Sequence, residues 1–378
     1  MGDAAFVGKG SCGRYCQYMI HIDESAPQVS AVRLAFPAHR YRQEEIVAEF
    51  TAMCLPGEHP GREVFARFGR TTGVQTRNLA LPLDRYAKLS GFTEANDAFI
   101  EVAQELGEAA LREALDAAGV RPDEVDLIAT TSVTGLAVPS LDARLAARVG
   151  LRPDVKRLPL FGLGCVAGAA GVARLHDYLR SFPDQVAVLL AVELCSLTVQ
   201  QQDTTPANLV ASSLFGDGAA AVVMVGGQRA TAQPGRPRVL ATRSRLYPDT
   251  EQVMGWRIGS TGFQIVLSNE VAPIAERFLG GDVRGFLADH DVDETDVATW
   301  ICHPGGPKVI DTIEKILDLP PEALQPTRRS LAGRGNLSSV SVLDVLHEAM
   351  AAPPREDQPG LMIAMGPGFC SELVLLGW

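Results

Sequence analysis

The 378-residue sequence predicts an α/β fold built from two duplicated βαβ halves in a layered α/β/α/β/α arrangement. A chain of this length with 46% hydrophobic residues can bury a large core in one large domain or two similar ones. In each half an apolar strand is followed by a helix and then another strand, which is typical of a mostly parallel sheet covered by helices. A constant shift of 172 residues also superimposes three elements of the first half on the second, which indicates an internal duplication. The superimposed segments are Val125–Thr131 on Val297–His303, Leu189–Ala191 on Leu361–Ile363, and Cys165 on Leu337.

The first half begins with about 90 irregular residues, punctuated by proline and glycine, which we expect to cover the core. They contain one apparent helix at Glu44–Met53. A long helical pattern at Ala95–Gly119 ends at a glycine C-cap, and the apolar Val125–Thr131 follows as a buried strand. This half closes with Leu214–Val225, a glycine turn that leads into an apolar strand.

The boundary between the halves is expected in Gly226–Pro237, because glycine and proline are typical of a linker. We therefore predict an N-terminal half at residues 1–232 and a C-terminal half at residues 233–378. The second half ends in Gly366–Trp378, which again is a glycine turn followed by an apolar strand.

Composition excludes several classes of function. The net charge of −11 and the pI near 5.2 argue against nucleic-acid binding, which needs a basic surface. No apolar run approaches the roughly 20 residues that cross a bilayer, and the N-terminus lacks the apolar core of a signal peptide, so we expect a cytoplasmic protein without a membrane partner.

Seven scattered cysteines do not form a disulfide framework. Cys12 and Cys16 lack a second ligand pair at zinc-site spacing and, like Cys54, are expected to be packing residues, so no metal site is predicted.

Cys165 has the most constrained surroundings in the chain. Gly162 and Gly164 precede it, and small residues followed by an amphipathic run, Val172 to Leu179, indicate that a buried helix begins there. A cysteine at a helix N-terminus is expected to have a stabilised thiolate, because unpaired N–H groups and the helix dipole favour negative charge. A lone cysteine can equally be a small core residue, so the case depends on its partners.

Two partners follow from the duplication. The 172-residue shift predicts that Cys165 and Asn336-Leu337 begin equivalent, facing helices, with His303 projecting into the same space from the end of a strand. The turn after His303, PGGP, suits a side chain that is held at an opening. An imidazole could hold the thiolate as an ion pair, and imidazole and amide could together stabilise charge on a thioester oxygen. This constellation predicts acyl transfer without a metal or redox cofactor.

Five segments together resemble the type III polyketide synthases, the chalcone and stilbene synthase superfamily. They are GCVAGAAG around Cys165, WICHPGGPKVID around His303, GRGNLSSVSVLDVL around Asn336, LFGDGAAA around Phe215, and the terminal GPGFCSELVL. The similarity covers nearly the whole chain from about residue 60. The stretch that begins VELCSLTVQQQ is more similar to bacterial alkylpyrone and alkylresorcinol synthases than to the plant enzymes.

The resemblance implies a thiolase-like fold, a homodimer, acyl-CoA and malonyl-CoA as substrates, and no cofactor besides these CoA thioesters. It implies that Cys165 is the nucleophile, that His303 and Asn336 bind the thioester oxygen during decarboxylation, and that Phe215 is a gate. After decarboxylative condensation, the chain would close to a pyrone or resorcinol-type product.

The resemblance also implies a cavity and a CoA-binding surface. A second gating position falls on Ile265, with Phe263 two residues earlier, and Val138 is expected to reach the neighbouring subunit's cavity. Small and apolar residues at the cavity positions would favour an aliphatic, fatty-acyl starter. These positions are Val133, Thr134, Cys195, Thr198, Gly255 and Ser338. Lys308 and the N-terminal arginines Arg62 and Arg67 are candidates for contacts with CoA phosphates.

Three alternatives stay open at the level of sequence. An initiating β-ketoacyl-acyl-carrier-protein synthase would share the fold and the Cys, His and Asn set, and would be recognised by its dependence on a carrier protein. A non-catalytic thiolase-like partner subunit would be expected to lose its nucleophile, whereas Cys165 is intact. A hydrolase could use Cys165 and His303, but paired donors without a third residue to orient the imidazole suit condensation better.

Overall fold

A computed structural model of the chain describes residues 23–233 and 235–378. Its main sheet has nine strands in the order β11-β12-β13-β8-β1-β7-β6-β4-β5. The two parts of this sheet meet at one residue pair, Gln28 of β1 with Arg238 of β8. The first part contains β1 (Gln28–Ala35), β7 (Asp217–Val225), β6 (Val186–Leu194), β4 (Leu127–Thr131) and β5 (Lys156–Leu160). The second contains β8 (Arg238–Leu246), β13 (Cys370–Gly377), β12 (Pro359–Gly366) and β11 (Thr299–Cys302).

The strands are buried on both faces, which explains their continuous apolar sequences. In β6, Val188 faces one hydrophobic core and its neighbour Leu189 faces another, as the two-residue period of a strand requires. In β12, Met362 and Ile363 likewise point into different cores. Each part of the sheet therefore needs helices on both sides.

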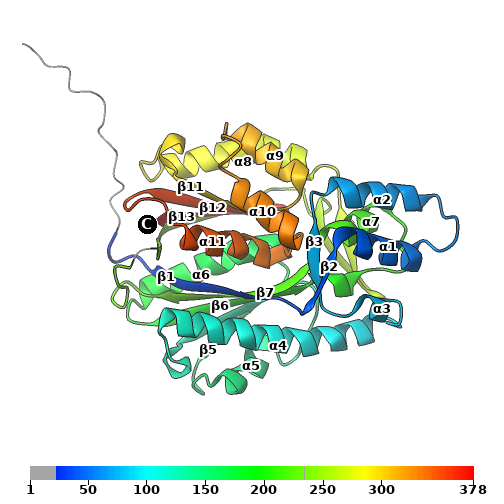
Figure 1. Cartoon of the computed structure of the whole chain (residues 1–378). Coiled ribbons are helices and arrows are strands. Elements are labelled where there is room, and N and C mark those ends of the chain that lie inside the picture. The colour runs from blue at the N-terminus through cyan, green and yellow to red at the C-terminus, as the bar shows by residue number, and fades with distance from the viewer. Residues whose placement is uncertain (1–22, 234) are drawn as a thin grey trace, which may run out of the picture.

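Helices fill these positions and complete five layers (Figure 1). Two helices, α6 (Ala167–Ser181) and α11 (Ser341–Ala351), lie between the two parts of the sheet and share a core with both. Helices α4 (Phe92–Ala118) and α5 (Leu141–Val149) cover the first part, and α8 (Val271–Ala288) and α9 (Pro307–Ile316) cover the second. The predicted α/β/α/β/α layering is confirmed.

The glycines of the Cys165 segment allow this close packing. A methyl group on Gly168 of α6 would lie 2.2 Å from the carbonyl oxygen of Ser339, and one on Gly171 would lie 2.5 Å from Leu189. Both distances are shorter than carbon–carbon or carbon–oxygen contacts allow, so these positions need glycine for α6 to approach its neighbours.

The structure contains the predicted duplication, but the offset between equivalent residues of the two halves is not constant along the chain. Strands β4 and β11 begin at Leu127 and Thr299, which keeps the 172-residue shift. The 3₁₀ turns before the central helices, Gly164–Val166 and Ser338–Val340, are 174 residues apart, because the second half has two additional residues before its helix. The residue equivalent to Cys165 in its turn is therefore Ser339, and the predicted pairing with Leu337 is wrong by two positions.

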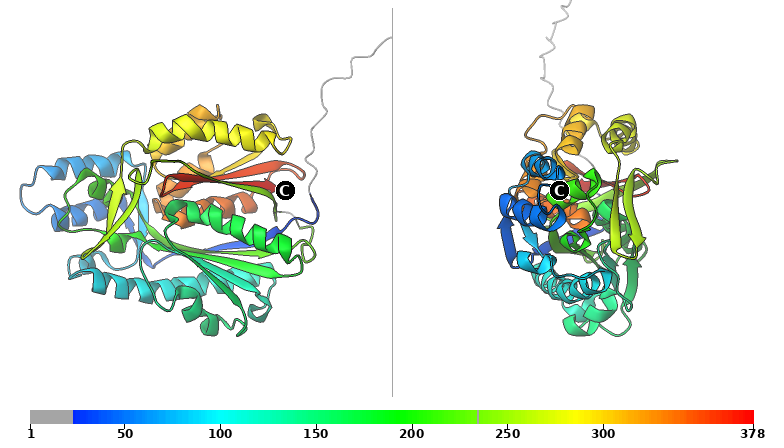
Figure 2. Two further views of the ribbon diagram at one scale, coloured as in Figure 1. Left: turned by 180° about the vertical axis from the view of Figure 1, so that it is seen from behind. Right: turned by 90° about the vertical axis from the view of Figure 1, so that its right-hand side faces the viewer.

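The first 90 residues differ from the irregular cover that the sequence predicts. Among those described, β1 is an inner strand that pairs with β7, whereas the predicted helix Glu44–Met53 lies within α1 (Gln43–Cys54). The other elements of this region are β2 (His39–Arg42), α2 (Gly61–Thr71), β3 (Thr76–Leu79) and α3 (Leu83–Tyr86). They gather with α7 (Pro206–Leu214) at one end of the layered body (Figure 2). Cys12 and Cys16 lie outside the described residues.

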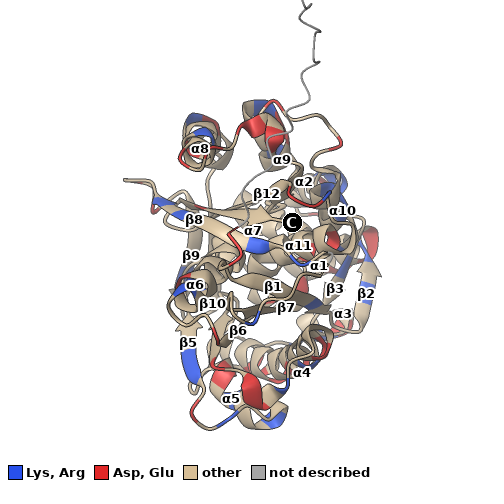
Figure 3. Cartoon of the chain, turned by 90° about the vertical axis from the view of Figure 1, so that its left-hand side faces the viewer, with Lys and Arg blue, Asp and Glu red and all other residues tan. Residues whose placement is uncertain are grey.

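The remaining elements complete the second half and its surface. They are β9 (Met254–Gly259), β10 (Gly262–Leu267) and α10 (Gln325–Arg334), and residues 226–237 connect β7 to β8. The domain boundary at residues 232 and 233 stays a prediction. Charged residues lie mainly on the outer helices and on the edge strand β5, where Lys156 and Arg157 are exposed (Figure 3). No helix within residues 23–233 and 235–378 is long and apolar enough to span a bilayer.

Candidate active site

Cys165 lies in the 3₁₀ turn Gly164–Val166 that leads into α6. The residue is 9% exposed, and its thiol Sγ lies 3.6 Å from the hydroxyl oxygen of Ser338. Gly164 has a φ of +56°, and a methyl group there would lie 2.6 Å from Pro367. The turn that presents the thiol therefore requires glycine, for its backbone angles and for the close approach of the C-terminal GPG segment.

The surroundings of Cys165 do not stabilise its thiolate, in contrast to what the sequence predicts. Burial raises the pKa of the Cys165 thiol to about 12; the hydrogen bond with Ser338 lowers this pKa, and the negative charge of Glu193 raises it. Burial outweighs the favourable contacts at this helix start, because a thiolate loses its hydration there. The thiol is therefore protonated at neutral pH.

His303 directly follows β11 and is 5% exposed. Its backbone N–H donates to the carbonyl of Ile363, at 2.9 Å, which extends the pairing of β11 with β12. Burial lowers the pKa of the imidazole to about 4, so it is neutral at physiological pH. Its Nδ1 is buried without a hydrogen-bond partner among the described residues. Burial disfavours the charged forms of both His303 and Cys165, and so opposes the predicted ion pair between imidazolium and thiolate.

Asn336 is held where two chain segments cross. Its backbone N–H donates to the carbonyl of Leu214, and its carbonyl accepts from the N–H of Gly216, at 2.9 and 3.0 Å. In the side chain, Oδ1 accepts from the N–H of Ser338 at 2.8 Å and Nδ2 donates to the carbonyl of Gly305 at 3.3 Å. An amide nitrogen carries two hydrogens, so one of them is still available to another acceptor.

A chain of contacts connects the three predicted catalytic residues. Cys165 contacts Ser338, which bonds to Asn336; Asn336 reaches Gly305, whose N–H donates to the carbonyl of His303 at 2.9 Å. The three residues therefore come from three separate parts of the sequence and are connected through neighbouring contacts at the end of β11 and at the two central helical turns. A thiol, a neutral imidazole and an amide so arranged can carry out nucleophilic acyl transfer with stabilisation of an oxyanion.

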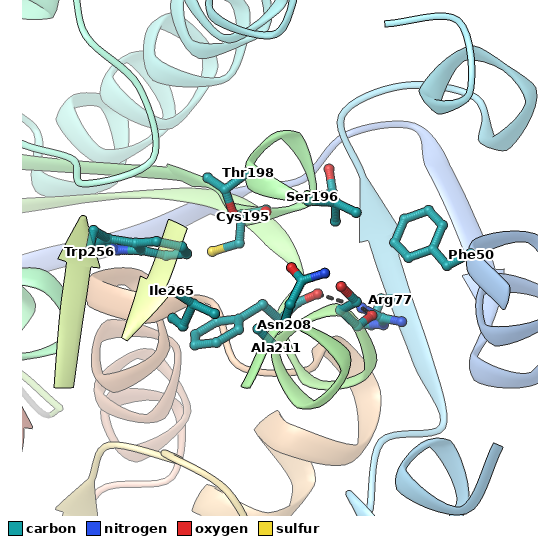
Figure 4. Close-up of a pocket in the computed structure, with 12 residues that line it drawn as sticks. Phe50, Arg77, Cys195, Ser196, Thr198, Asn208, Ala211, Trp256 and Ile265 are labelled. Carbon is teal, nitrogen blue, oxygen red and sulfur yellow. Dashed lines mark hydrogen bonds between the residues drawn. The ribbon is translucent and has the colours of Figure 1, made fainter. Parts of the chain in front are cut away.

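A small cavity is lined in part by Phe215, which forms a bridge with Asn336 (Figure 4). Four of the predicted gate and cavity residues line it, namely Phe215, Ile265, Cys195 and Thr198. Its volume is about 10 Å³, which is room for about one water molecule. The other lining residues are Phe50, Arg77, Ser196, Val199, Asn208, Ala211, Ser212 and Trp256.

The other predicted cavity residues lie around this space without lining it. Phe263 packs edge-on against Phe92 and Trp256, and Gly255 pairs with Val266 in the β9–β10 hairpin. Val133 and Thr134 both contact Glu193, and Ser338 contacts Cys165. Val138 is 94% exposed in the single chain.

The candidate CoA-binding residues lie on α2 and at the start of α9. Arg62 donates to the carbonyls of Leu55 and Gly57, and Arg67 lies over the ring of Phe68. Lys308 is exposed in the first turn of α9. A methyl group on Gly73, just beyond α2, would lie 3.7 Å from Pro307, so the two helix ends are neighbours.

Glu193 is a buried carboxylate that sequence reasoning missed. Its Oε1 accepts from the hydroxyl of Ser339 at 2.5 Å, and its Oε2 accepts from the hydroxyl of Thr134 at 3.0 Å and from the N–H of Val133 at 3.2 Å. Burial raises its pKa to about 7, although these bonds favour the charged form. A single carboxylate near the end of the apolar run Val186–Leu194 was the signal that could have identified it.

The sequence groups Arg77 only with the N-terminal basic residues and gives it no role in the site, but the structure buries it, with 1% exposed. It lines the small cavity, and its Nη2 and the hydroxyl of Ser212 are both buried without a partner among the described residues. Nothing in the local sequence distinguishes it from the exposed arginines of α2.

Comparison with known proteins places the chain in a family. The model of the N-terminal domain of chalcone and stilbene synthases matches residues 19–228, and that of the C-terminal domain matches residues 238–377. The chain is 53% identical to a 1,3,6,8-tetrahydroxynaphthalene synthase of Streptomyces peucetius subsp. caesius, over 93% of each protein. It is 33% identical to a putative chalcone synthase of Bacillus subtilis, over 93% of this chain and 98% of that protein.

A solved structure agrees with this assignment. The crystal structure of the 1,3,6,8-tetrahydroxynaphthalene synthase from Streptomyces coelicolor A3(2), a bacterial type III polyketide synthase, matches with a TM-score of 0.87 and 30% identity, over 93% of this chain and 99% of that one. Since both family models and the fold match over nearly the whole length, the chain belongs to the chalcone and stilbene synthase family and is a type III polyketide synthase, a condensing acyltransferase.

Proposed function

We propose that this enzyme makes 1,3,6,8-tetrahydroxynaphthalene, with malonyl-CoA as both starter and extender. The observation that carries the proposal is 53% identity, over 93% of both chains, to a relative with that activity in its name. Polar side chains beside the predicted gate residues Phe215 and Ile265, those of Ser196 and Asn208, agree with a polar malonyl starter, whereas the sequence alone favours a fatty-acyl starter.

The carbon count of this product agrees with malonyl units. A malonyl starter contributes three carbons, and four extensions each add two carbons and release one CO₂. Loss of the starter's own carboxyl group as CO₂ then leaves the ten carbons of a naphthalene. The ten-carbon chain carries five carbonyl groups, counting the thioester carbonyl. Four of their oxygens remain as the hydroxyls on alternating carbons, the fifth leaves as water when an aldol condensation closes one ring, and the sulfur of the thioester leaves when a Claisen condensation closes the other.

Cys165 would form the acyl-enzyme. As its sulfur attacks the thioester carbonyl, the thiol proton passes to the neutral imidazole of His303, and the departing CoA sulfur takes that proton up. The neutral imidazole has a free nitrogen to accept the proton. Because burial raises the pKa of the thiol and lowers that of the imidazole, we propose that this transfer is concerted with attack on the thioester carbonyl.

His303 and Asn336 would then assist decarboxylation of the malonyl extender. When CO₂ leaves, the negative charge moves to the thioester oxygen as an enolate. Hydrogen bonds from the imidazole N–H and from the free amide hydrogen of Asn336 stabilise that charge in a water-poor site. The enolate carbon attacks the acyl group on Cys165, a carbon–carbon bond forms, and the sulfur of Cys165 leaves. In this scheme all reacting groups come from the chain and the CoA thioesters, so no cofactor is required.

A homodimer is part of the proposal. The loop with Leu136 and Val138 exposes apolar side chains, and Val138 is 94% exposed beside Pro139. A protein surface usually buries such a loop against another chain. We expect sedimentation equilibrium to give the mass of a dimer, and Val138→Asp to weaken the association.

The test of the proposed reaction is mass spectrometry of products from ¹³C-labelled malonyl-CoA, alone and with a panel of acyl-CoA starters. We expect tetrahydroxynaphthalene with all ten carbons labelled when malonyl-CoA is the only substrate, and no product from Cys165→Ala. A product that forms only when a fatty acyl-CoA is added would refute the malonyl starter and support a pyrone or resorcinol product. A requirement for malonyl carrier protein would support the β-ketoacyl synthase alternative.

A further inference from the structure

Arg77 is a buried cation with no ion-pair partner among residues 23–233 and 235–378. Burial lowers the pKa of its guanidinium to about 10, and the nearby charge of Asp217 raises it, so the group stays charged at neutral pH. A buried charge without an ion pair needs several hydrogen bonds to offset its lost hydration. What those bonds hold in place is therefore informative.

The acceptors of Arg77 are at the end of α7. Arg77 lies beside the end of α7 (Figure 4), where Nη1 donates to the carbonyls of Ser212 and Phe215, at 2.9 and 2.6 Å. Its Nε donates to Oε1 of Gln43 at 3.0 Å. Gln43 in turn donates to the carbonyl of Ser213 at 2.5 Å. The last carbonyls of a helix lack partners within the helix and attract cations. Arg77 and Gln43 together therefore cap α7 and fix the residue that follows it, Phe215.

The same arginine also supports the segment that carries Asn336. A methyl group on Gly335 would lie 3.0 Å from Cδ of Arg77 and 2.7 Å from the carbonyl oxygen of Leu214. Phe215 and Asn336 form a parallel bridge directly beside this contact. The stem of Arg77 thus packs under Gly335, while its head group holds the carbonyl of Phe215.

We propose that Arg77 is a positioning residue that sets the crossing of Phe215 with Asn336, and so fixes the gate aromatic and the amide donor relative to each other. This inference rests on the role of Asn336 in the proposed function and on the gate role that the family resemblance implies for Phe215. The planar guanidinium spans the acceptors in a fixed geometry, whereas a lysine ammonium is a single point of charge on a flexible stem. Arg77→Lys keeps the charge and loses that geometry.

The test compares Arg77→Lys and Gln43→Ala with wild type and with a control, Arg328→Gln. Arg328 pairs with Asp311 and Glu314 and lines no part of the small cavity. Two quantities are measured below the melting temperature of every variant. The first is kcat/KM for malonyl-CoA, resolved into kcat and KM. The second is the rate at which iodoacetamide alkylates Cys165, followed on its peptide by mass spectrometry.

We expect Arg77→Lys to lower kcat/KM at least about 10-fold, chiefly through kcat. If Phe215 is the gate that the resemblance implies, its loosening should also speed alkylation of Cys165 at least about threefold. Gln43→Ala should shift both quantities in the same direction by less, and Arg328→Gln should change each by less than about twofold. A folded Arg77→Lys with wild-type values of both quantities, or one with only a lower melting temperature, would overturn the proposal. If Arg77→Lys does not fold, Gln43→Ala with unchanged alkylation overturns it instead.

The two proposals fail separately. If wild type consumes no malonyl-CoA, the proposed function is wrong, while the alkylation rates still decide whether Arg77 positions Phe215. If wild type makes the expected product and the alkylation rates do not differ, only the role of Arg77 is wrong.

Discussion

The hydroxyl of Ser338 lies 3.6 Å from the thiol of Cys165, although 173 residues separate them. Ser338 has a φ of +52°, and its N–H donates to the side chain of Asn336. A left-handed backbone at a non-glycine residue persists only where its surroundings hold it. Here the hydrogen bond from the N–H of Ser338 to Oδ1 of Asn336 holds the backbone of Ser338 in this conformation. As a result, the hydroxyl of Ser338 provides a polar contact to the buried sulfur of Cys165.

The first prediction concerns the pH dependence of Cys165 reactivity. Because burial raises the thiol pKa to about 12, the thiolate fraction increases with pH throughout the neutral range. We expect the rate of Cys165 alkylation by iodoacetamide to rise about tenfold per pH unit between about pH 7 and 9, without a plateau. His303→Ala should leave this slope unchanged, since the imidazole is neutral. A plateau near pH 7 in wild type that His303→Ala abolishes would instead show an ion pair.

A second prediction concerns Ser338→Ala. The hydroxyl of Ser338 lowers the pKa of the Cys165 thiol, so its removal should raise that pKa and slow alkylation about 3- to 10-fold at pH 8. Ser330→Ala is a suitable control, because Ser330 is also buried but bonds to Asp344. Equal alkylation rates in Ser338→Ala and wild type would show that the 3.6 Å contact does not stabilise the thiolate.

The layering could be predicted from sequence because it depends on apolar periodicity. Strands that are buried on both faces, such as β6 and β12, have continuous apolar sequences, and the small residues of α6 indicate close packing. By contrast, β1 was missed. It lies between β7 and β8 in the sheet but enters from a region rich in turn signals, so its place is set by long-range pairing.

For the site, sequence could identify reactive residue types but not their charge states. Cys165, His303 and Asn336 stand in distinctive segments, whereas the neutral imidazole and the protonated thiol follow from burial, which only the assembled fold determines. Glu193 and Arg77 are ordinary residues in sequence. They become noticeable only when the fold buries them completely beside the site.

A third prediction links Glu193 to stability. The pKa of the Glu193 carboxyl is about 7 in the folded protein, whereas its ordinary value is 4.5. The folded state therefore binds the proton of this carboxyl more tightly than the unfolded state does. The protonated carboxyl of Glu193 therefore contributes about 3 kcal/mol to the free energy of unfolding. This contribution is fully present below about pH 4.5 and is lost as the pH rises through about 7. Glu193→Gln should therefore flatten the decrease in the free energy of unfolding across this range, measured by urea titration at several pH values.

The control for that measurement is Glu348→Gln. Glu348 forms a surface ion pair with Arg329 and lies away from the buried carboxylate. We expect its pH profile of stability to follow that of wild type. If Glu193→Gln and Glu348→Gln have the same profile, Glu193 is not the group that titrates.

The last prediction separates backbone strain from steric contact at the nucleophile turn. Gly162 and Gly164 both have positive φ, +91° and +56°, but a methyl group on Gly162 would have no atom within 4 Å, whereas one on Gly164 would lie 2.6 Å from Pro367. Gly162→Ala should therefore lose only about 1 to 2 kcal/mol of stability through strain and keep most of its activity. Gly164→Ala should lose more, because Pro367 and the turn that carries Cys165 must move apart. Urea unfolding and product formation from malonyl-CoA measure the two effects. Both substitutions strain a backbone with positive φ, and that strain is the larger at Gly162, whereas only Gly164→Ala also meets Pro367. A larger loss of activity in Gly164→Ala therefore reports how much catalysis depends on the contact between the GPG segment and the cysteine turn. Equal losses of activity would show that this contact has no part in placing the thiol.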